Sequence, residues 1–415
     1  MLFYSIYGNV ITLYRNLMIV GFGGIFMNFK VIILAITAVT VGLVELIVGG
    51  ILPIIASDLN ITIGTAGQLI TVFALVYAIS GPVLLSLTAK IERKKLYLIA
   101  LTIFFLGNLM TYFSPTYTLI MIARVITAMS AALVIVLSLT IAPRIVEPAH
   151  QGKAIGLIYM GISSALVLGV PIGILLTNAF GWRSVFLGIA VLSIGSGILI
   201  YTFLEQIPSG NVLPISTQIK ALGNVKIVGA HLALMFMLAG HYTLYAYFTP
   251  FLETTLNLSP TWISISYFLF GLAAVSGGAI GGTLADRIGS PKSILIVISF
   301  FAIILYVLPY VTFSFPVFLV VMVIWGALSW ALTPPMQSYV IQTDPESSDI
   351  HQSLNNSALQ LGIALGSGIG GITLSHFESV ISTAHVGSGV VVIAFLCAIY
   401  SLTRQSSVSQ TEGSK

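Results

Sequence analysis

The chain has 415 residues, of which 57% are hydrophobic and only 7% are charged, and its mean hydropathy is +1.07. Soluble globular proteins carry about 25% charged residues, so a soluble fold is excluded and lipid must surround much of the surface. The single cysteine, Cys397, excludes an intramolecular disulfide framework and a thiolate metal cluster, and a net charge of +4 without basic runs interleaved by aromatic residues excludes a nucleic-acid surface.

The first 26 residues fit neither a membrane span nor a signal peptide. Their apolar stretch is interrupted at Arg15, and no small-residue cleavage site follows it. Gly23-Gly24 can be encoded by a ribosome-binding sequence lying shortly before Met27. Residues 1–26 are therefore interpreted as an untranslated leader, and the alternative is a short interfacial segment.

Twelve apolar stretches follow, each long enough to cross a bilayer as a helix. They lie at 31–52, 66–88, 96–113, 118–142, 154–177, 184–203, 227–249, 261–284, 293–313, 316–341, 356–376 and 386–403. The polar stretch 205–225 separates the first six from the last six. The sequence thus predicts an all-α membrane protein with two six-helix halves, 27–204 and 226–404, joined by the linker 205–225 and ending in a tail, 405–415.

Lysine and arginine set the orientation of the spans, because cytoplasmic loops retain them. The loops after odd-numbered spans contain one such residue, Arg183. The loops after even-numbered spans contain Lys90, Arg93, Lys94, Lys95, Arg144, Lys153, Lys220, Lys226, Arg287 and Lys292. Both termini are therefore predicted to be cytoplasmic.

An internal repeat relates the two halves. Positions 197 residues apart match without a gap at Pro53 and Pro250, Leu59-Asn60 and Leu256-Asn257, Gly81 and Gly278, Lys90-Ile91 and Arg287-Ile288, Leu168-Gly169 and Leu365-Gly366, and Ile172-Gly173 and Ile369-Gly370. Two halves of the same hand imply a pseudo-two-fold axis along the membrane normal. Carriers built this way bind substrate near the midplane and rock one half against the other.

Three motifs carry a resemblance to a known family. The run 282–289 (GTLADRIG) after span eight, the run 169–173 (GVPIG) in span five and the run 43–53 (LVELIVGGILP) in span one resemble motifs of the major facilitator superfamily, specifically its twelve-helix drug:proton antiporter branch. The first-half loop departs from the family pattern, because Ala89 stands where an Asp is expected. The gating role of that Asp is therefore carried over only to Asp286.

Within that branch, residues 27–404 resemble most closely the purine base and nucleoside efflux pumps of Gram-positive bacteria. The resemblance rests on 239–248 (AGHYTLYAYF), 90–97 (KIERKKLY) and 348–353 (SDIHQS). It implies a monomer in a bacterial inner (plasma) membrane that exchanges protons for a small-molecule cargo, without a cofactor.

Two charged residues are candidates for proton coupling. Glu45 lies in the middle of the first span, where a charged carboxylate in lipid is costly, so the group must face a cavity, pair with a cation or hold a proton. The alternative is a structural hydrogen bond that fixes helix packing. Arg124, near the outer start of span four, could pair with Glu45 or polarise it, and the alternative is an arginine that snorkels to the headgroups.

The gating residues follow from the resemblance. Gly169, Pro171 and Gly173 are expected to bend span five and to seal the outer side, because glycine permits close approach and proline removes a backbone hydrogen bond. The alternative is ordinary tight packing. The loop residues Gly282, Asp286, Arg287 and Gly289 are expected to latch the halves in one state, and the alternative is topogenic charge with a helix cap.

Aromatic and amide side chains are the candidates for binding cargo. Tyr242 and Tyr245 share a face of span seven beside His241, and flat aromatic rings stack on heterocycles for about 1–3 kcal/mol per base. Asn356 and Gln360 present amides one turn apart in span eleven, as the edge of a purine requires. Trp325 in span ten adds a further wall. The alternative for each residue is helix packing.

The sequence lacks a phosphate-binding GxxxxGK[ST] loop and an HExxH motif, so neither an ATP-driven pump nor an enzyme is expected. The leading hypothesis is proton-coupled export of purine bases, nucleosides or analogues by alternating access. A second hypothesis is a multidrug or sugar efflux antiporter of the same fold. A third is a non-transporting receptor or scaffold.

Overall fold

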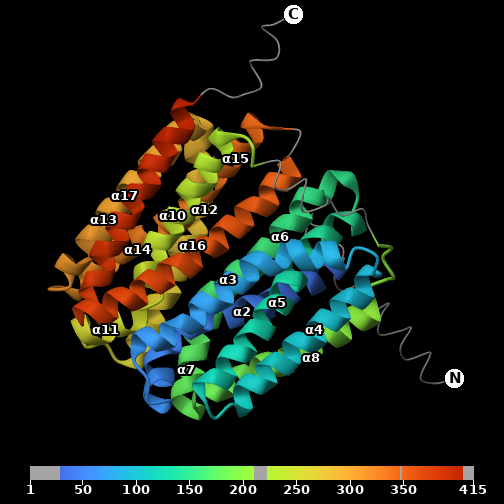
Figure 1. The fold of residues 1–415 in the computed structure, drawn as a ribbon, viewed down its shortest axis with the longest axis horizontal. Helices are drawn as coiled ribbons and strands as arrows, with labels where there is room; N and C mark the ends of the chain where they lie inside the picture. The colour runs from blue at the N-terminus through green and yellow to red at the C-terminus, as the bar shows by residue number, and fades with distance from the viewer. Residues whose placement is uncertain (1–28, 210–221, 346–347, 405–415) are drawn as a thin grey trace, which may run out of the picture.

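The computed structural model describes residues 29–209, 222–345 and 348–404, and these residues fold as helices and short connections (Figure 1). The expectations for residues 1–26, for the middle of the linker and for the tail lie outside the described residues. The helices of the first half are α2 (Phe29–Asp58), α3 (Ile63–Leu87), α4 (Arg93–Phe113), α5 (Tyr117–Ile141), α6 (Gln151–Ser164), α7 (Val170–Phe180) and α8 (Trp182–Phe203). Those of the second half are α10 (Val225–Tyr245), α11 (Phe248–Leu256), α12 (Pro260–Ile288), α13 (Ser290–Val307), α14 (Phe315–Ala331), α15 (Thr333–Thr343), α16 (Ser348–Phe377) and α17 (Ile381–Thr403).

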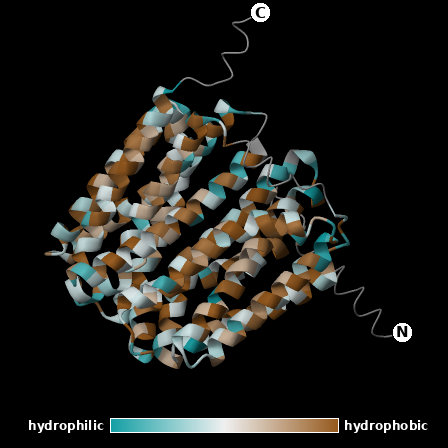
Figure 2. Ribbon diagram, viewed as in Figure 1, coloured by the Kyte–Doolittle hydropathy of each residue, from teal (hydrophilic) through white to brown (hydrophobic). Residues whose placement is uncertain are grey.

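Twelve of the described helical segments are long and apolar enough to cross a bilayer, as the sequence predicts (Figure 2). A helix satisfies its own backbone hydrogen bonds, which is the requirement that lipid imposes. The predicted end of span seven is wrong. Span seven was expected to run to residue 249, but α10 ends at Tyr245 and α11 begins at Phe248. Pro250 has no N–H to donate to the carbonyl four residues earlier, which favours a break there.

The backbone confirms the internal repeat. Helices α12 and α13 begin at Pro260 and Ser290, each 197 residues after the first residues of α3 and α4. Within the described chain, five residues adopt a positive φ, and four of them form two pairs with the same offset. These pairs are Asn60 with Asn257, both at φ 51°, and Gly181 with Glu378, at φ 81° and 50°. The halves therefore share turn geometry as well as helix order.

The halves contact each other mainly through two pairs of helices, α3 with α16 and α7 with α12. Small residues allow the close approach: a Cβ at Gly64 of α3 would lie 2.9 Å from the carbonyl oxygen of Gly371 in α16. Thr249 of α11 donates a hydrogen bond of 3.0 Å to the carbonyl of Gly50 in α2. The first contact brings two backbones together across the interface, and the second joins a side chain of one half to the backbone of the other.

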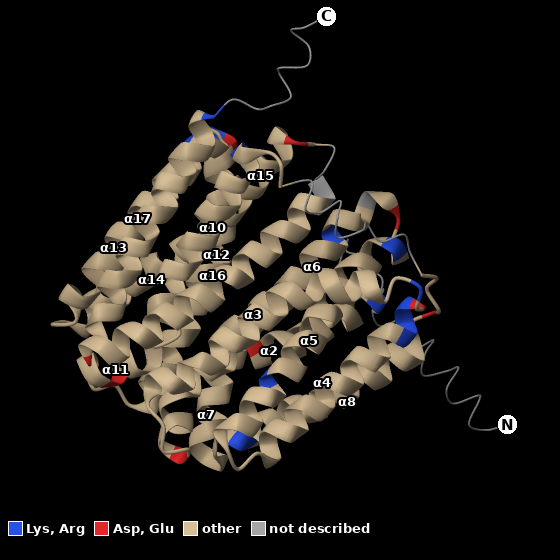
Figure 3. Cartoon of the chain, in the orientation of Figure 1, with Lys and Arg blue, Asp and Glu red and all other residues tan. Residues whose placement is uncertain are grey.

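Charged residues gather at the two ends of the helical bundle, and the helices between them are almost free of charge (Figure 3). We call the end that contains the first residue of α2 and the last residue of α17 the basic end. At the opposite end, Arg183 donates 2.6 Å and 3.2 Å hydrogen bonds to Asp58 and to the Ser114 carbonyl, and its guanidinium stacks on Trp182 at 4.4 Å. The one basic residue expected in that group of loops is thus tied down by three partners.

Candidate transport site

Glu45 lies near the middle of α2 and reaches across the interface between the halves. Its Oε1 accepts a hydrogen bond of 2.8 Å from Nε2 of Gln360, which projects from α16. Gln360 is 6% exposed, and its own Oε1 has no hydrogen-bond partner within the described protein. The carboxyl group therefore faces the other half, and the amide that holds it retains an unused acceptor.

Arg124 of α5 is 1% exposed, so the snorkelling alternative is wrong. Its Nη1 donates to the carbonyl of Val44 at 2.8 Å, and its Nε donates to the carbonyl of Leu69 at 3.3 Å. The guanidinium also lies over the ring of Phe73, 4.1 Å from its centroid. Arg124 is therefore clamped to the backbones of α2 and α3.

The described residues contain no direct ion pair between Arg124 and Glu45. The cation instead contacts the carbonyl of Val44, the residue immediately before Glu45. A charge fixed beside the carboxylate still favours its ionised form through space. The arrangement therefore permits Arg124 to influence Glu45 without competing with Gln360 for its oxygen atoms.

Further polar side chains line the same interface. Asn356, one helical turn before Gln360, pairs with the hydroxyl of Tyr77 from α3. Thr71 of α3 and Ser367 of α16 share a hydrogen bond of 2.9 Å. The polar side chains of α3 and α16 thus meet each other on either side of the Glu45–Gln360 contact.

The expected cargo residues of span seven divide between two environments. Tyr242 is half-buried and close enough to Glu45 for the two groups to interact electrostatically. His241 and Tyr245 instead pack inside the second half, where their ring centroids are 5.0 Å apart. Trp325 of α14 is fully buried and lies 5.3 Å from the His241 ring. We call His241, Tyr242, Tyr245, Phe270, Phe301 and Trp325 the aromatic box.

The aromatic box contains polar atoms that the described part of the protein does not satisfy. His241 Nδ1, Tyr245 Oη and Trp325 Nε1 are buried and have no hydrogen-bond partner within the described residues. Buried polar groups without a partner are rare and costly, and each calls for an explanation. Phe270 and Phe301 of this group were not expected from the sequence, because an isolated Phe in a lipid-compatible helix carries no distinguishing signal.

A π-helical turn over Ala165–Gly169 lies between α6 and α7, and the glycine and proline motif of span five begins at its last residue and continues into α7. Turns of this kind are frequent at functional sites. A Cβ at Gly169 would meet the side-chain end of Leu43, and one at Gly173 would meet that of Ile47, so both glycines let α2 pack closely and a larger residue would displace these side chains. On the other side, Ser264 of α12 donates a hydrogen bond of 2.9 Å to the carbonyl of Pro171.

A second contact between α12 and this turn was missed from the sequence. A Cβ at Gly271 would lie 2.7 Å from Cα of Val167, so the two backbones touch across the interface. No motif marks it in the sequence, because Val167 lies two residues before the motif of span five. The π-helical turn therefore contacts α2 in its own half and α12 in the other.

The loop motif after α12 lies at the basic end, away from Glu45. Gly289 has φ 84°, which glycine adopts without strain, and ends α12 directly before α13. Asp286 and Arg287 are exposed, and within the described residues neither forms a hydrogen bond or an ion pair with the first half. The latch expected from the resemblance is not formed in this conformation.

A comparison with protein families matches residues 34–367 to the model of the Major Facilitator Superfamily. The chain belongs to this superfamily. Its helices and its relatives together make it a multi-pass membrane transporter, and such transporters handle small-molecule substrates.

The relatives of this major facilitator transporter cover nearly its whole length. It is 35% identical to the uncharacterized MFS-type transporter YbcL of Bacillus subtilis, over 90% of this chain and 95% of that protein. It is 28% identical to the inner membrane transport protein YdhP of Escherichia coli, over 91% and 97%. It is 26% identical to a probable sugar efflux transporter of Helicobacter pylori, over 83% and 88%.

Solved structures confirm the fold of this superfamily member. A bacterial homologue of the human lysosomal transporter Spinster, inward-facing and occupied, superposes with a TM-score of 0.72 at 16% identity, covering 91% of this chain and 96% of that chain. The unoccupied form gives 0.70 at 17% identity, covering 90% and 95%. At these identities the likeness shows the arrangement of helices alone.

Proposed function

We propose that this transporter exports purine bases, nucleosides or close analogues in exchange for protons, by alternating access. The observation that supports the proposal most is the hydrogen bond between Glu45 and Gln360, because it joins an ionisable group of one half to an amide of the other. Glu45 serves as the proton carrier in this proposal, and Arg124 stabilises its ionised form. We place both termini in the cytoplasm of a bacterial cell and treat the protein as a monomer.

A carboxyl group at this depth can link protonation to movement. When Glu45 loses its charge, the hydrogen bond from Gln360 loses its charge-assisted part, which is worth about 1 kcal/mol or more. Alternating access needs such a bond to be weakened in one step and restored in the next. One net charge that crosses about 100 mV supplies about 2.3 kcal/mol, which sustains a gradient of nearly two decades for a neutral cargo.

The aromatic box supports a planar, polar cargo. A conformation that opens the box would expose flat apolar ring faces, and His241 Nδ1, Tyr245 Oη and Trp325 Nε1 are hydrogen-bonding atoms without partners among the described residues. A site that matches its cargo with such groups rejects analogues that lack the matching atoms. Asn356 and Gln360 add amides at the edge of the same region. Heterocyclic bases combine a flat face with donors and acceptors on the edge.

Two alternative functions remain: another kind of transporter, and a membrane protein that does not transport. A sugar or multidrug antiporter is favoured by the relatives named as probable sugar efflux transporters. A receptor or scaffold without transport is opposed by the buried Glu45 at the interface between the halves and by the intact loop motif 282–289 of the second half. Sugars lack flat aromatic faces and would gain less from the stacked rings of the box.

Reconstituted vesicles distinguish these functions. With an imposed pH gradient, the proposal expects labelled adenine, hypoxanthine or guanosine to move against its concentration gradient, while a labelled hexose and a cationic dye do not. Glu45→Gln keeps the shape of the side chain and removes titration, so it should abolish uphill movement but keep downhill exchange. Glu253→Gln, which changes a half-buried carboxyl of α11, is the matched control. Uphill transport of purines by Glu45→Gln would sink the proton assignment, and movement of the hexose instead would sink the cargo assignment.

A further inference from the structure

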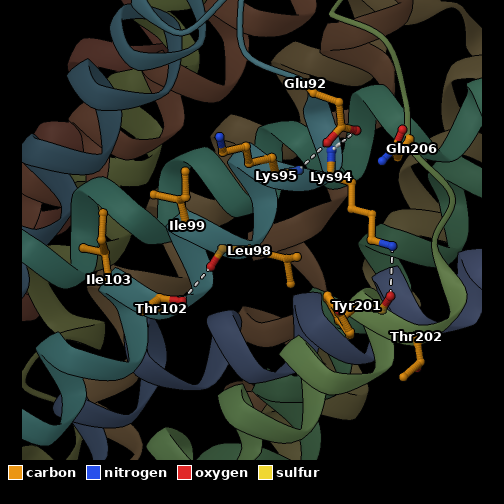
Figure 4. Close-up of a pocket in the computed structure, with 10 residues that line it drawn as sticks. All are labelled: Glu92, Lys94, Lys95, Leu98, Ile99, Thr102, Ile103, Tyr201, Thr202 and Gln206. Carbon is orange, nitrogen blue, oxygen red and sulfur yellow. Dashed lines mark hydrogen bonds between the residues drawn. The ribbon is translucent and has the colours of Figure 1, made fainter.

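A groove of about 900 Å³ lies on the outer surface of the first half, between α4 and the end of α8 (Figure 4). It is separate from the transport site and opens where lipid surrounds the protein. Its lining divides into a basic part, with Lys94 and Lys95, and an apolar part, with Leu98, Ile99 and Ile103.

The basic and apolar parts of the groove lie at the levels of the headgroups and of the acyl chains of one leaflet. Helix α4 has 21 residues and therefore spans about 30 Å, the thickness of the hydrocarbon core. Lys94 and Lys95 are in its first turn, which is the headgroup level. Ile103 is eight residues further on, so it lies about 12 Å deeper, at the level of the acyl chains.

The basic part retains hydrogen-bond donors for a ligand. Nζ of Lys94 donates to the carbonyl of Tyr201 at 2.9 Å, which uses one of the three donors of the ammonium and positions the charge over the groove. The side chain of Lys95 is exposed, and within the described residues no hydrogen bond or ion pair engages it. Both lysines line the groove, and their side chains extend in different directions from the start of α4, that of Lys94 toward Tyr201 and that of Lys95 toward the side of Ile99 (Figure 4).

The acid of the groove does not neutralise these lysines directly. The carboxylate of Glu92 accepts backbone hydrogen bonds of 2.9, 2.8 and 2.7 Å from Lys94, Lys95 and Ile207. Partial burial alone would raise the pKa of Glu92, but these three bonds outweigh it and keep the pKa below the ordinary value. Both carboxylate oxygens are thus turned toward the start of α4, and the lysine side chains remain available.

We propose that this groove binds an anionic phospholipid of the leaflet at the basic end. The phosphate and its headgroup lie against Lys94 and Lys95, and one acyl chain lies along Ile99 and Ile103, whose side chains are each 41% exposed. Basic pockets between membrane helices bind anionic headgroups through this combination of charge and apolar surface. The proposal does not depend on the cargo or on proton coupling.

Native mass spectrometry of the delipidated full chain tests the lipid site. Phosphatidylglycerol and phosphatidylcholine with identical acyl chains are added separately, and the expected result is preferential retention of phosphatidylglycerol. Lys94→Gln with Lys95→Gln should reduce that preference roughly fivefold for each lysine. Lys153→Gln with Lys292→Gln, which removes two exposed lysines outside the groove, is the matched control and should keep the preference.

A second variant protects the test against a folding defect. Ile99→Trp fills the apolar part of the groove without changing a charge, and Ile99 is exposed enough to accept the change. It should lower the retention of phosphatidylglycerol while both lysines remain. Equal preference in the wild type and the Lys94/Lys95 variant would overturn the proposal. So would displacement of the lipid by soluble glycerol phosphate at the same concentration, because that result would mean that the apolar part contributes nothing.

Discussion

Gly271→Ala should shift the balance between the two arrangements of the halves. In this structure the new Cβ would lie 2.7 Å from Cα of Val167 and 3.2 Å from the carbonyl oxygen of Leu166. Both atoms belong to the backbone of the π-helical turn, so a side-chain rotation cannot relieve the clash. Helix α12 must therefore move away from the turn.

The magnitude follows from the cost of overpacking. Inserting a methyl group into a well-packed contact costs about 1–3 kcal/mol, which corresponds to a shift of roughly 5- to 150-fold in a two-state equilibrium. Gly278→Ala is the matched control, because it lies on the same helix and a Cβ there meets nothing within 4 Å. Both variants gain similarly from the higher helix propensity of alanine, so their difference isolates the clash.

Pulsed electron paramagnetic resonance measures the result. Replacing Cys397 with serine leaves a chain without cysteine, and spin labels at Ala179 of α7 and Thr261 of α12 report on the distance between the halves. Both sites are exposed. We expect Gly271→Ala to populate longer distances and Gly278→Ala to resemble the parent. Identical distance distributions in the two variants would refute the reasoning that this backbone contact helps to hold the observed arrangement.

Three further predictions concern stability, each measured by thermal unfolding in detergent. Arg124→Lys cannot reproduce the donors to Val44 and Leu69 and should cost at least about 2 kcal/mol, whereas an unchanged midpoint would show that the clamp is dispensable. Glu378→Gly should stabilise by about 0.5–1 kcal/mol because it relieves a φ of 50°, and an equal gain from Asn257→Gly would contradict this, since asparagine tolerates that conformation. The pKa of Glu92 is lowered in the folded state, so this carboxylate stabilises the fold above the pKa of an unfolded glutamate, about 4.3, and the stabilisation is lost as the pH falls through the folded pKa. The difference in unfolding temperature between the wild type and Glu92→Gln should therefore shrink in acid. A difference that stays constant with pH would argue against this role.

Hydropathy and repeats were sufficient to predict the fold, because lipid imposes helical spans of fixed length and gene duplication leaves matching turns. The repeat even anticipates backbone geometry, as Asn60 and Asn257 show. The boundary of span seven could not be predicted in the same way. Hydrophobicity continues through Ala246, and only the local break before Pro250 separates α10 from α11.

The site was predicted less completely than the fold. The depth of Glu45 marks it from the sequence alone, but its partner does not follow from spacing, because Gln360 lies 315 residues away in the other half. Arg124 was another candidate partner, and in the structure its Nε and Nη1 donate to backbone carbonyls, while its Nη2 has no hydrogen-bond partner among the described residues. Whether Gln360 or Arg124 reaches Glu45 depends on how each helix is rotated about its axis. Helices that are apolar on all faces do not reveal this rotation from their sequence.

The contact between Gln360 and Glu45 has a consequence for the order of events in the proposed cycle. The amide nitrogen of Gln360 has two N–H donors, and one of them holds the carboxylate. A heterocycle that takes the other donor, or the unpartnered Oε1, can therefore bind before Glu45 is released. In the proposed cycle cargo and acid then act on the orientation of one side chain, and the exchanger needs no separate relay between its two ligands.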